Sequence, residues 1–317
     1  MRFLVTGGAG FIGSHITEKL LKQGHFVRVL DNFSSGKIDN LFFTEEPANR
    51  RVFELIKGDI RNTNDCLNAA KGVDFILHQA ALRSVPKSLE NPAEYNEVNI
   101  DGTLNILNAA LKNKVKRLVF ASSSSVYGES NKFPERETDA PLLISPYALT
   151  KLAGEYYCRI FSMNYGLETA CLRYFNVFGP RQGIDDEYAV VVPKFITMML
   201  NDQQPTIHGT GRQSRDFTFI DNVVSANIEC ALSKKRLLGD VFNIGVGFDN
   251  TILNLVRALN KIMQKKIKPV FIDKRPGDVE KTLASIAKAK KIIGWQPTVN
   301  FEQGLKMTVD WFKQKCQ

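Results

Sequence analysis

A glycine-rich turn near the N-terminus constrains the fold more than any other stretch of this chain. Residues 2–6 predict a short buried strand, and Gly7-Gly-Ala-Gly-Phe-Ile-Gly13 follows it directly. After the glycines, Ile12, Ile16 and Leu20 recur at helical spacing. A strand, a glycine turn and a helix in this order predict a dinucleotide site, because the glycines let the backbone approach a pyrophosphate that the helix N-terminus attracts.

A carboxylate after the second predicted strand indicates which dinucleotide binds. The strand at residues 26–30 ends at Asp31, eighteen residues after Gly13. A carboxylate at this place accepts hydrogen bonds from ribose hydroxyls and repels the additional 2′-phosphate of NADP. We therefore expect NAD as the cofactor.

Strand-like and helix-like segments continue to alternate along the first half of the chain. Further strands are predicted at residues 52–57, 73–78, 116–121 and 169–174, and long helices at about 92–112 and around Tyr147, running to about residue 165. This alternation predicts an α/β fold with a doubly wound parallel sheet.

The alternation breaks after residue 175, where loops rich in glycine and proline follow. We expect a Rossmann domain over residues 1–175 and a smaller α/β substrate-binding domain mainly over residues 176–317. Two strand-like segments, 215–220 and 241–244, are candidates for a return to the first domain.

A tyrosine and a lysine four residues apart form a candidate proton shuttle. They lie in Ser145-Pro-Tyr-Ala-Leu-Thr-Lys151, and on a helix Tyr147 and Lys151 share one face. A free tyrosine has a pKa near ~10. An ammonium group beside it favours the phenolate and lowers that pKa. The alternative is a solvated helix face.

Composition narrows the class of protein. The chain has 317 residues, no run of eighteen apolar residues, and an N-terminus that enters a strand rather than a signal peptide. Its five cysteines are scattered without a Cys-x-x-Cys pair, which favours a reducing compartment over a disulfide framework or zinc site. We expect a cytoplasmic enzyme with no membrane segment and no metal.

The net charge of +9 indicates an anionic partner, either nucleic acid or a phosphorylated small molecule. The basic clusters at 234–236, 265–266 and 288–291 are short, separate and free of interleaved aromatic residues. A nucleic-acid platform needs both a continuous basic surface and aromatic rings. We interpret the clusters as solvated faces and expect no nucleic-acid partner.

Four motifs together resemble the extended short-chain dehydrogenase/reductase family. They are the glycine turn, Ser122-Ser-Ser-Ser-Val-Tyr-Gly128, the Tyr147–Lys151 pair and Arg173-Tyr-Phe-Asn-Val-Phe-Gly179. Within that family, Arg173 to Gly179, Arg215-Asp-Phe and Arg275-Pro-Gly-Asp278 are similar to the nucleotide-sugar 4-epimerases, above all the UDP-N-acetylglucosamine 4-epimerases. The resemblance covers essentially the whole chain.

The resemblance implies two sets of binding residues. For NAD they are Gly7, Gly10, Phe11, Ile12 and Gly13 at the pyrophosphate, Asp31, Asn32, Ser35 and Gly36 at the adenosine ribose, Asp59 and Ile60 at the adenine, and Gln79, Ala80, Ala81, Asn99, Tyr147, Lys151 and Phe175 along the rest. For the UDP-sugar they are Arg83, Ser123, Tyr147, Asn176, Val191, Arg215, Arg275, Asp278 and Thr282. Arg83 is equally well read as a surface charge.

The resemblance also implies a mechanism. Tyr147, as phenolate, takes the proton of the sugar 4-hydroxyl while C4 passes hydride to NAD, and Lys151 stabilises the phenolate. Ser123, or its neighbour Ser124, hydrogen-bonds the same oxygen. The 4-keto sugar then turns over and receives the hydride on its other face.

Two serines separate this chain from sister enzymes in the family. In the 4,6-dehydratases an Asp–Glu pair follows the active-site hydroxyl, and in the decarboxylases a glutamate stands at the second of those places. Here the two places hold Ser124 and Ser125. Elimination and decarboxylation therefore lack their acid and base, and an epimerase needs neither.

The substrate is predicted from Thr282. At the matching place, epimerases restricted to glucose and galactose forms carry a bulky tyrosine, whereas a small residue leaves room for a 2-acetamido group. We expect UDP-N-acetylhexosamines (UDP-GlcNAc and UDP-GalNAc), with UDP-glucose and UDP-galactose as further substrates. A polar turn residue without a gate role, a UDP-uronic acid substrate and a non-catalytic NAD-sensing scaffold are the alternatives.

The resemblance finally implies a homodimer. The helices at residues 92–112 and 146–165 would form a four-helix interface between two copies of the chain.

Overall fold

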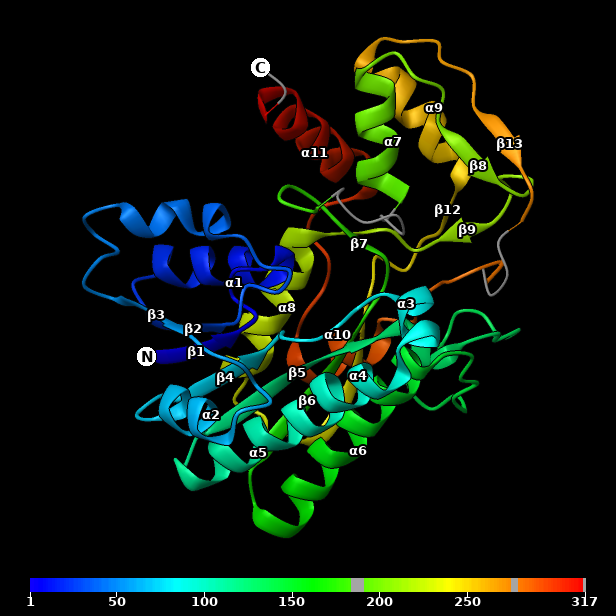
Figure 1. Cartoon of the computed structure of the whole chain (residues 1–317). Helices are drawn as coiled ribbons and strands as arrows, with labels where there is room; N and C mark the ends of the chain where they lie inside the picture. Colours follow the sequence, from blue (N-terminus) through cyan, green and yellow to red (C-terminus); the bar gives the residue numbers. More distant parts are fainter. Residues whose placement is uncertain (184–190, 275–278, 316–317) are drawn as a thin grey trace.

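A computed structural model of the chain describes residues 1–183, 191–274 and 279–315 (Figure 1). Its centre is a seven-stranded sheet in the order β11-β6-β5-β4-β1-β2-β3, with every pair parallel. The strands are β1 (Arg2–Thr6), β2 (Phe26–Asp31), β3 (Phe53–Lys57), β4 (Phe75–His78), β5 (Arg117–Ser123), β6 (Glu168–Tyr174) and β11 (Leu238–Ile244). The predicted parallel sheet is confirmed.

Helices cover both faces of the sheet (Figure 1). On one face α1 (Phe11–Lys22) packs against α8 (Ile220–Leu232), and on the other lie α2 (Thr63–Ala70), α5 (Gly102–Lys112) and α6 (Pro146–Tyr165). Successive residues of β1 therefore enter different cores: Phe3 and Val5 face one cluster and Leu4 the other. This explains why the central strands are apolar on both sides.

The predicted helix over residues 92–112 is present but interrupted. It consists of α4 (Pro92–Asn96), the π-helical turn η2 (Glu97–Asp101) and α5, and α3 (Val85–Glu90) precedes it. The short 3₁₀ helices η1 (Ile38–Glu45) and η3 (Ser124–Tyr127) follow β2 and β5. Single π turns often occur at functional sites, and this one contains Asn99.

Several segments of the second half of the chain form a group of helices and small sheets outside the main sheet. α7 (Val191–Leu200), α9 (Ile252–Met263) and α11 (Phe301–Lys315) pack together. Beside them β8 (Thr206–His208) pairs with β13 (Val270–Ile272), and β9 (Ser214–Arg215) with β12 (Asn250–Thr251). β7 (Val177–Phe178) pairs with β10 (Thr218–Phe219).

The two strand-like segments considered for a return to the first domain lie in different sheets. Residues 241–244 lie in β11, which pairs with β6 at the sheet edge, and α10 (Ala287–Ile293) packs against β11. Residues 215–220 form parts of β9 and β10, outside the main sheet. Their backbone groups bond elsewhere, since the N–H of Asp216 donates to the carbonyl of Thr282 and that of Thr218 to Asn176.

In the described part of the chain, no helix is long and apolar enough to cross a membrane.

Candidate active site

A cavity of about 590 Å³ opens at the carboxyl ends of the parallel strands. It is lined by residues that directly follow or end β1 to β6, and ligands bind at this edge in open α/β sheets. The predicted residues that line it are Gly7, Gly10, Phe11, Ile12, Gly13, Asp31, Asn32, Ser35, Asp59, Ile60, Gln79, Ala80, Ala81, Arg83, Ser123, Ser124, Tyr147, Lys151 and Asn176.

The glycine turn fits a pyrophosphate. Gly7 has a φ of +66°, and a Cβ there would lie 2.8 Å from the backbone nitrogen of Ala80. A Cβ on Gly13 would overlap the carbonyl oxygen of Gly7. No described side chain caps the N-terminus of α1, and its first turn holds no acidic residue. Its first N–H groups can therefore donate to an anion.

Asp31, the last residue of β2, and Asp59, which follows β3, also line the cavity. The buried Asp31 carboxylate accepts from the N–H groups of Ala9 and Phe33, both at 2.8 Å. The Asp59 carboxylate accepts from Arg61 at 2.7 Å and from the Asn32 amide at 2.8 Å. The Arg61 hydrogen bonds hold the pKa of Asp59 well below its usual range. Two anchored carboxylates suit ribose hydroxyls and disfavour a further phosphate, as NAD requires.

Helix α6 presents the tyrosine and the lysine to the end of β5. The helix begins at a Ser145 cap, whose hydroxyl accepts from the Ala148 N–H at 3.2 Å, and ends at Gly166 with a φ of +74°. Tyr147 and Lys151 are buried one turn apart. The Lys151 Nζ donates to the carbonyl of Ala121 at 2.8 Å and lies 5.9 Å from the centroid of the Tyr147 ring.

The electrostatics of this pair differ from the sequence argument. Burial raises the pKa of Tyr147, while a hydrogen bond with Ser123 and the charge of Arg83 lower it. Burial lowers the pKa of Lys151 to about 7, and its ammonium bonds to Ala121 rather than to the phenol. Burial therefore opposes the lower Tyr147 pKa that its spacing to Lys151 predicts.

The hydroxyls of the serine run lie in two different elements, β5 and η3. Ser122 and Ser123 are the last residues of β5, because they pair with Arg173 and Tyr174 of β6. The Ser123 hydroxyl donates to Ser125 Oγ at 2.9 Å and bonds to Tyr147. This contact favours Ser123 over Ser124 as the partner of the sugar oxygen.

Several predicted residues lie behind the lining or outside it. Asn99 accepts from the Leu82 N–H at 2.8 Å and donates to Thr150 at 3.0 Å, so it supports the wall from behind. Phe175 is buried against Tyr127. Gly36 packs against Ala9 and Asp31. Val191 is the first residue of α7. Arg215 is buried and donates to the carbonyl of Ser214 at 2.8 Å. Arg275 and Asp278 lie outside the described residues.

Thr282 lies directly behind a lining residue. Its hydroxyl accepts from the Asn176 side-chain amide at 2.8 Å, and it is buried. Asn176 itself lines the cavity. The predicted gate residue thus touches the wall of the cavity through Asn176.

Sequence reasoning missed one lining residue with unused hydrogen-bonding capacity. Gln182 is buried and donates to the Val177 carbonyl at 2.9 Å, but its Oε1 has no partner within the described structure. Buried acceptors are rarely left unpaired. The loop Gly179-Pro-Arg-Gln-Gly183 is visible in the sequence as punctuation, yet nothing in its pattern indicates which side chain turns inward.

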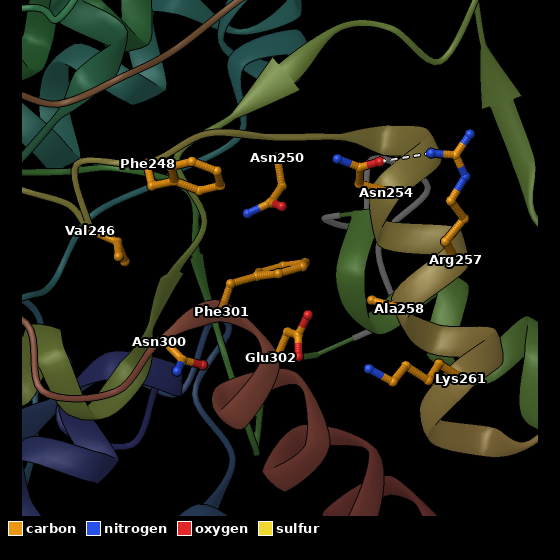
Figure 2. A pocket seen from close by; sticks show the side chains of 10 residues that line it. All are labelled: Val246, Phe248, Asn250, Asn254, Arg257, Ala258, Lys261, Asn300, Phe301 and Glu302. Carbon is orange, nitrogen blue, oxygen red and sulfur yellow. Dashed lines mark hydrogen bonds between the residues drawn. The ribbon is translucent and has the colours of Figure 1, made fainter.

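A second hollow of about 510 Å³ lies between α9, the start of α11 and the loop after β11 (Figure 2). The rings of Phe248 and Phe301 face it, with Arg257 and Lys261 along α9. Its described lining contains no tyrosine, serine, cysteine or histidine. None of the predicted site residues lines this second hollow.

Comparison with known proteins decides the family. Residues 3–245 match the model of the NAD dependent epimerase/dehydratase family. The chain belongs to this family. A putative UDP-glucose 4-epimerase of Methanocaldococcus jannaschii is 38% identical over 98% of this chain and 98% of its own.

Solved structures of the family share the whole fold. The UDP-N-acetylglucosamine 4-epimerase of Methanobrevibacter ruminantium M1, in complex with UDP-N-acetylmuramic acid, is 40% identical with a TM-score of 0.93. That likeness covers 99% of this chain and 98% of the other. The UDP-glucuronic acid 4-epimerase of Bacillus cereus, in complex with UDP-glucuronic acid and NAD, is 35% identical, with a TM-score of 0.91 over 99% and 100% of the two chains. The predicted family and the predicted cofactor, NAD, are confirmed.

Proposed function

We propose that this enzyme is a UDP-sugar 4-epimerase whose preferred substrates are UDP-N-acetylhexosamines. The observation that carries the proposal is the contact of Tyr147 with Ser123 at the sheet edge, beside Ser124 and Ser125 rather than an acid–base pair. NAD, when bound, supplies a hydride acceptor and donor for the sugar C4. The protein must then move one proton at the sugar O4 and hold the nucleotide.

Tyr147 is the residue that accepts and returns the proton of the sugar O4. Its hydroxyl is the buried acid–base group of the cavity, and Ser123 supports the same oxygen by hydrogen bonding. Lys151, fixed on the Ala121 carbonyl, contributes positive charge nearby and a donor for a ribose hydroxyl. Burial raises the pKa of Tyr147, whereas the hydrogen bond with Ser123 and the charge of Arg83 lower it, and NAD, when bound, would add the positive charge of its nicotinamide ring.

The acetamido preference rests on Thr282. Its short side chain is buried against Asn176, which faces the cavity. An aromatic residue at this place would push Asn176 into the space that a 2-acetamido group needs. The orphaned acceptor of Gln182 would take a hydrogen bond from a sugar hydroxyl or amide N–H.

A UDP-uronic acid is the second candidate substrate, because of Arg83. Arg83 lines the cavity close enough to Tyr147 for its charge to lower the pKa of the tyrosine. A guanidinium beside the reacting end of the sugar would pair with a C6 carboxylate. The unsubstituted glucose and galactose forms offer no such group.

The test is to incubate the purified protein separately with UDP-GlcNAc, UDP-glucose and UDP-glucuronic acid and quantify each 4-epimer. We expect the acetamido pair to interconvert fastest, and Tyr147→Phe to lose activity by about 10²- to 10⁴-fold, the usual contribution of a general acid–base group. Faster turnover of the uronic acid would favour the Arg83 alternative. Absence of any epimer would refute the proposed reaction.

We also propose a homodimer through α6 and the 92–112 region. Leu149, Tyr156, Ile160 and Met163 are apolar residues of α6 that are between 44% and 67% exposed and lie at helical spacing. Such a stripe is typical of a helix–helix interface. Light scattering should give twice the chain mass, and Ile160→Glu should shift it to one; a wild-type monomer would contradict the proposal.

A reducing, cytoplasmic setting is proposed from the cysteines. Cys66, Cys158, Cys171 and Cys230 are free and buried, and the thiols of Cys158 and Cys171 are within hydrogen-bonding distance without being joined. Neighbouring thiols persist in compartments that keep them reduced.

A further inference from the structure

Three side chains of helix α6 form hydrogen bonds with the end of β5. Two of them belong to the proposed proton-transfer pair, Tyr147 and Lys151. Tyr147, Lys151 and Glu155 are buried at intervals of four residues on one face of the helix. They bond to Ser123, the Ala121 carbonyl and the Ser122 hydroxyl, respectively. The contact of Glu155 with Ser122 takes no direct part in the proposed proton transfer.

The third contact is a buried ionic triad. Ser122 Oγ donates to Glu155 Oε1 at 2.5 Å. Arg173 donates two hydrogen bonds to the same carboxylate, from Nε to Oε1 at 2.8 Å and from Nη2 to Oε2 at 2.7 Å. The Glu155 and Arg173 side chains are each 5% exposed. Ser122 and Arg173 are direct cross-strand neighbours on β5 and β6, so one carboxylate ties both strands to α6.

The triad is itself anchored on its far side. The Arg173 guanidinium lies 4.7 Å from the centroid of the Tyr127 ring, and the Tyr127 hydroxyl donates to Asn243 Oδ1 at 2.7 Å. Asn243 belongs to β11, the edge strand next to β6. The position of Ser122 is therefore fixed by four elements of the fold.

Stability alone is a weak reason for such a triad. Desolvating two charges is costly, and apolar residues of similar volume are often as stable or more so. Ser122, however, stands between Ala121, whose carbonyl holds Lys151, and Ser123, which bonds to Tyr147. Fixing the Ser122 side chain fixes the peptide groups on either side of it.

We infer that Glu155 is a positioning residue for the proposed epimerase reaction. Through Ser122 it sets the orientation of the Ala121 carbonyl and the Ser123 hydroxyl toward Lys151 and Tyr147, and Arg173 keeps its carboxylate in place. Because Ser122 donates its proton to Glu155, it is not a donor for the sugar oxygen. This inference rests on the function proposed above.

The test compares two double variants that carry no charge in the triad. A single Glu155→Gln would leave Arg173 buried without a counter-ion, which destabilises strongly. Arg173→Met is therefore combined with either Glu155→Gln or Glu155→Leu. The two proteins differ in one feature, since only glutamine offers Ser122 an acceptor.

We expect the leucine variant to lose about ten- to hundredfold in kcat with KM little changed, as for a displaced catalytic group. The glutamine variant should recover most of that loss. Equal kcat values in the two variants would overturn the inference. Glu168→Gln is the matched control, because Glu168 pairs with Arg117 across the same two strands at their opposite end. It should lower thermal stability and leave kcat unchanged.

A second readout does not depend on turnover. The hydrogen bond with Ser123 lowers the pKa of Tyr147, so losing the alignment should raise it. The ultraviolet titration of Tyr147, obtained by difference from the corresponding Tyr147→Phe proteins, should shift upward in the leucine variant and not in the glutamine variant. If wild-type protein shows no epimerase activity, the proposed function fails while this titration still decides the inference. An identical titration in both variants would overturn the inference.

Discussion

The two sides of the large cavity are built in different ways. The cofactor side consists of strand ends and a tight glycine turn, in which Gly7 and Gly13 leave no room for a side chain. The substrate side is held by contacts between segments far apart in the sequence, such as Asn176 with Thr282 and the Asp216 carboxylate with the N–H groups of residues 246, 247 and 284. The cofactor side therefore depends on local backbone geometry, and the substrate side on side chains paired across the fold.

The largest expected effect breaks the cofactor side alone. In Gly13→Ala the new methyl group overlaps the Gly7 carbonyl, so the turn must shift. Overpacking of this kind costs about 1–3 kcal/mol, which corresponds to a roughly ten- to hundredfold loss of NAD affinity. Calorimetric titration should show this loss while UDP affinity stays within about twofold.

Gly24→Ala is the matched control for that turn. Gly24 has a φ of +75°, a methyl group on its Cα would have no neighbour within 4 Å, and the residue lies outside the cavity. The substitution should lower thermal stability without changing NAD affinity. If both alanine variants bound NAD equally, the assignment of the glycine turn to the pyrophosphate would be wrong.

An effect of similar size, selective for one sugar, is expected on the substrate side. Thr282→Tyr places a ring where the threonine hydroxyl now accepts from Asn176. We expect kcat/KM for UDP-GlcNAc to fall by about 10- to 200-fold, the usual range for a steric clash in a pocket, and that for UDP-glucose to change little. NAD affinity should be unaffected.

Thr282→Val separates bulk from hydrogen bonding. It removes the bond to Asn176 but adds no volume, so a loss of about 3- to 10-fold for both sugars is expected. An equal loss of both substrates in the tyrosine variant would show that Thr282 supports Asn176 without selecting the sugar.

The smallest expected effect concerns pH. Burial raises the pKa of Glu135 to about 7, and its carboxyl accepts from the Leu283 N–H beside the substrate side. From about pH 4.5, where an unfolded glutamate loses its proton, up to about pH 7 the folded chain retains a proton that the unfolded chain has released. Folding stability from this group therefore falls as pH rises through that window.

Glu135→Gln should remove that slope, because glutamine keeps an acceptor for Leu283 and does not titrate. We expect the melting temperature of the variant to fall less than that of the wild type between these two pH values. Glu129→Gln, at an exposed position, is the control for the change of charge. An identical fall in all three proteins would contradict the assigned role of Glu135.

The cofactor side and the substrate side also differ in how far their residues could be predicted from the sequence. Strand, glycine turn, helix and Asp31 stand in one short stretch, and Tyr147 and Lys151 lie one helical turn apart, so local spacing was enough to find them. Most of the residues predicted for the cofactor side line the large cavity.

Elsewhere, tertiary pairing decided what local patterns could not. Ser122 and Ser123 extend β5 because β6 lies beside them, and Asn99 supports the wall from behind because a π turn rotates it there. The lowering of the Tyr147 pKa by Lys151 was predicted from spacing alone, whereas burial raises the pKa of Tyr147 and lowers that of Lys151. The inward turn of Gln182 has no local signature.

The most direct measurement is to run the reaction on UDP-GlcNAc in deuterated water and locate deuterium in the epimer by NMR. If the hydrogen on C4 leaves and returns as hydride while Tyr147 moves only the hydroxyl proton, the UDP-GalNAc formed keeps protium at C4. Deuterium at C4 would mean that this carbon exchanges a proton with solvent, and the proposed roles of NAD and Tyr147 would be wrong.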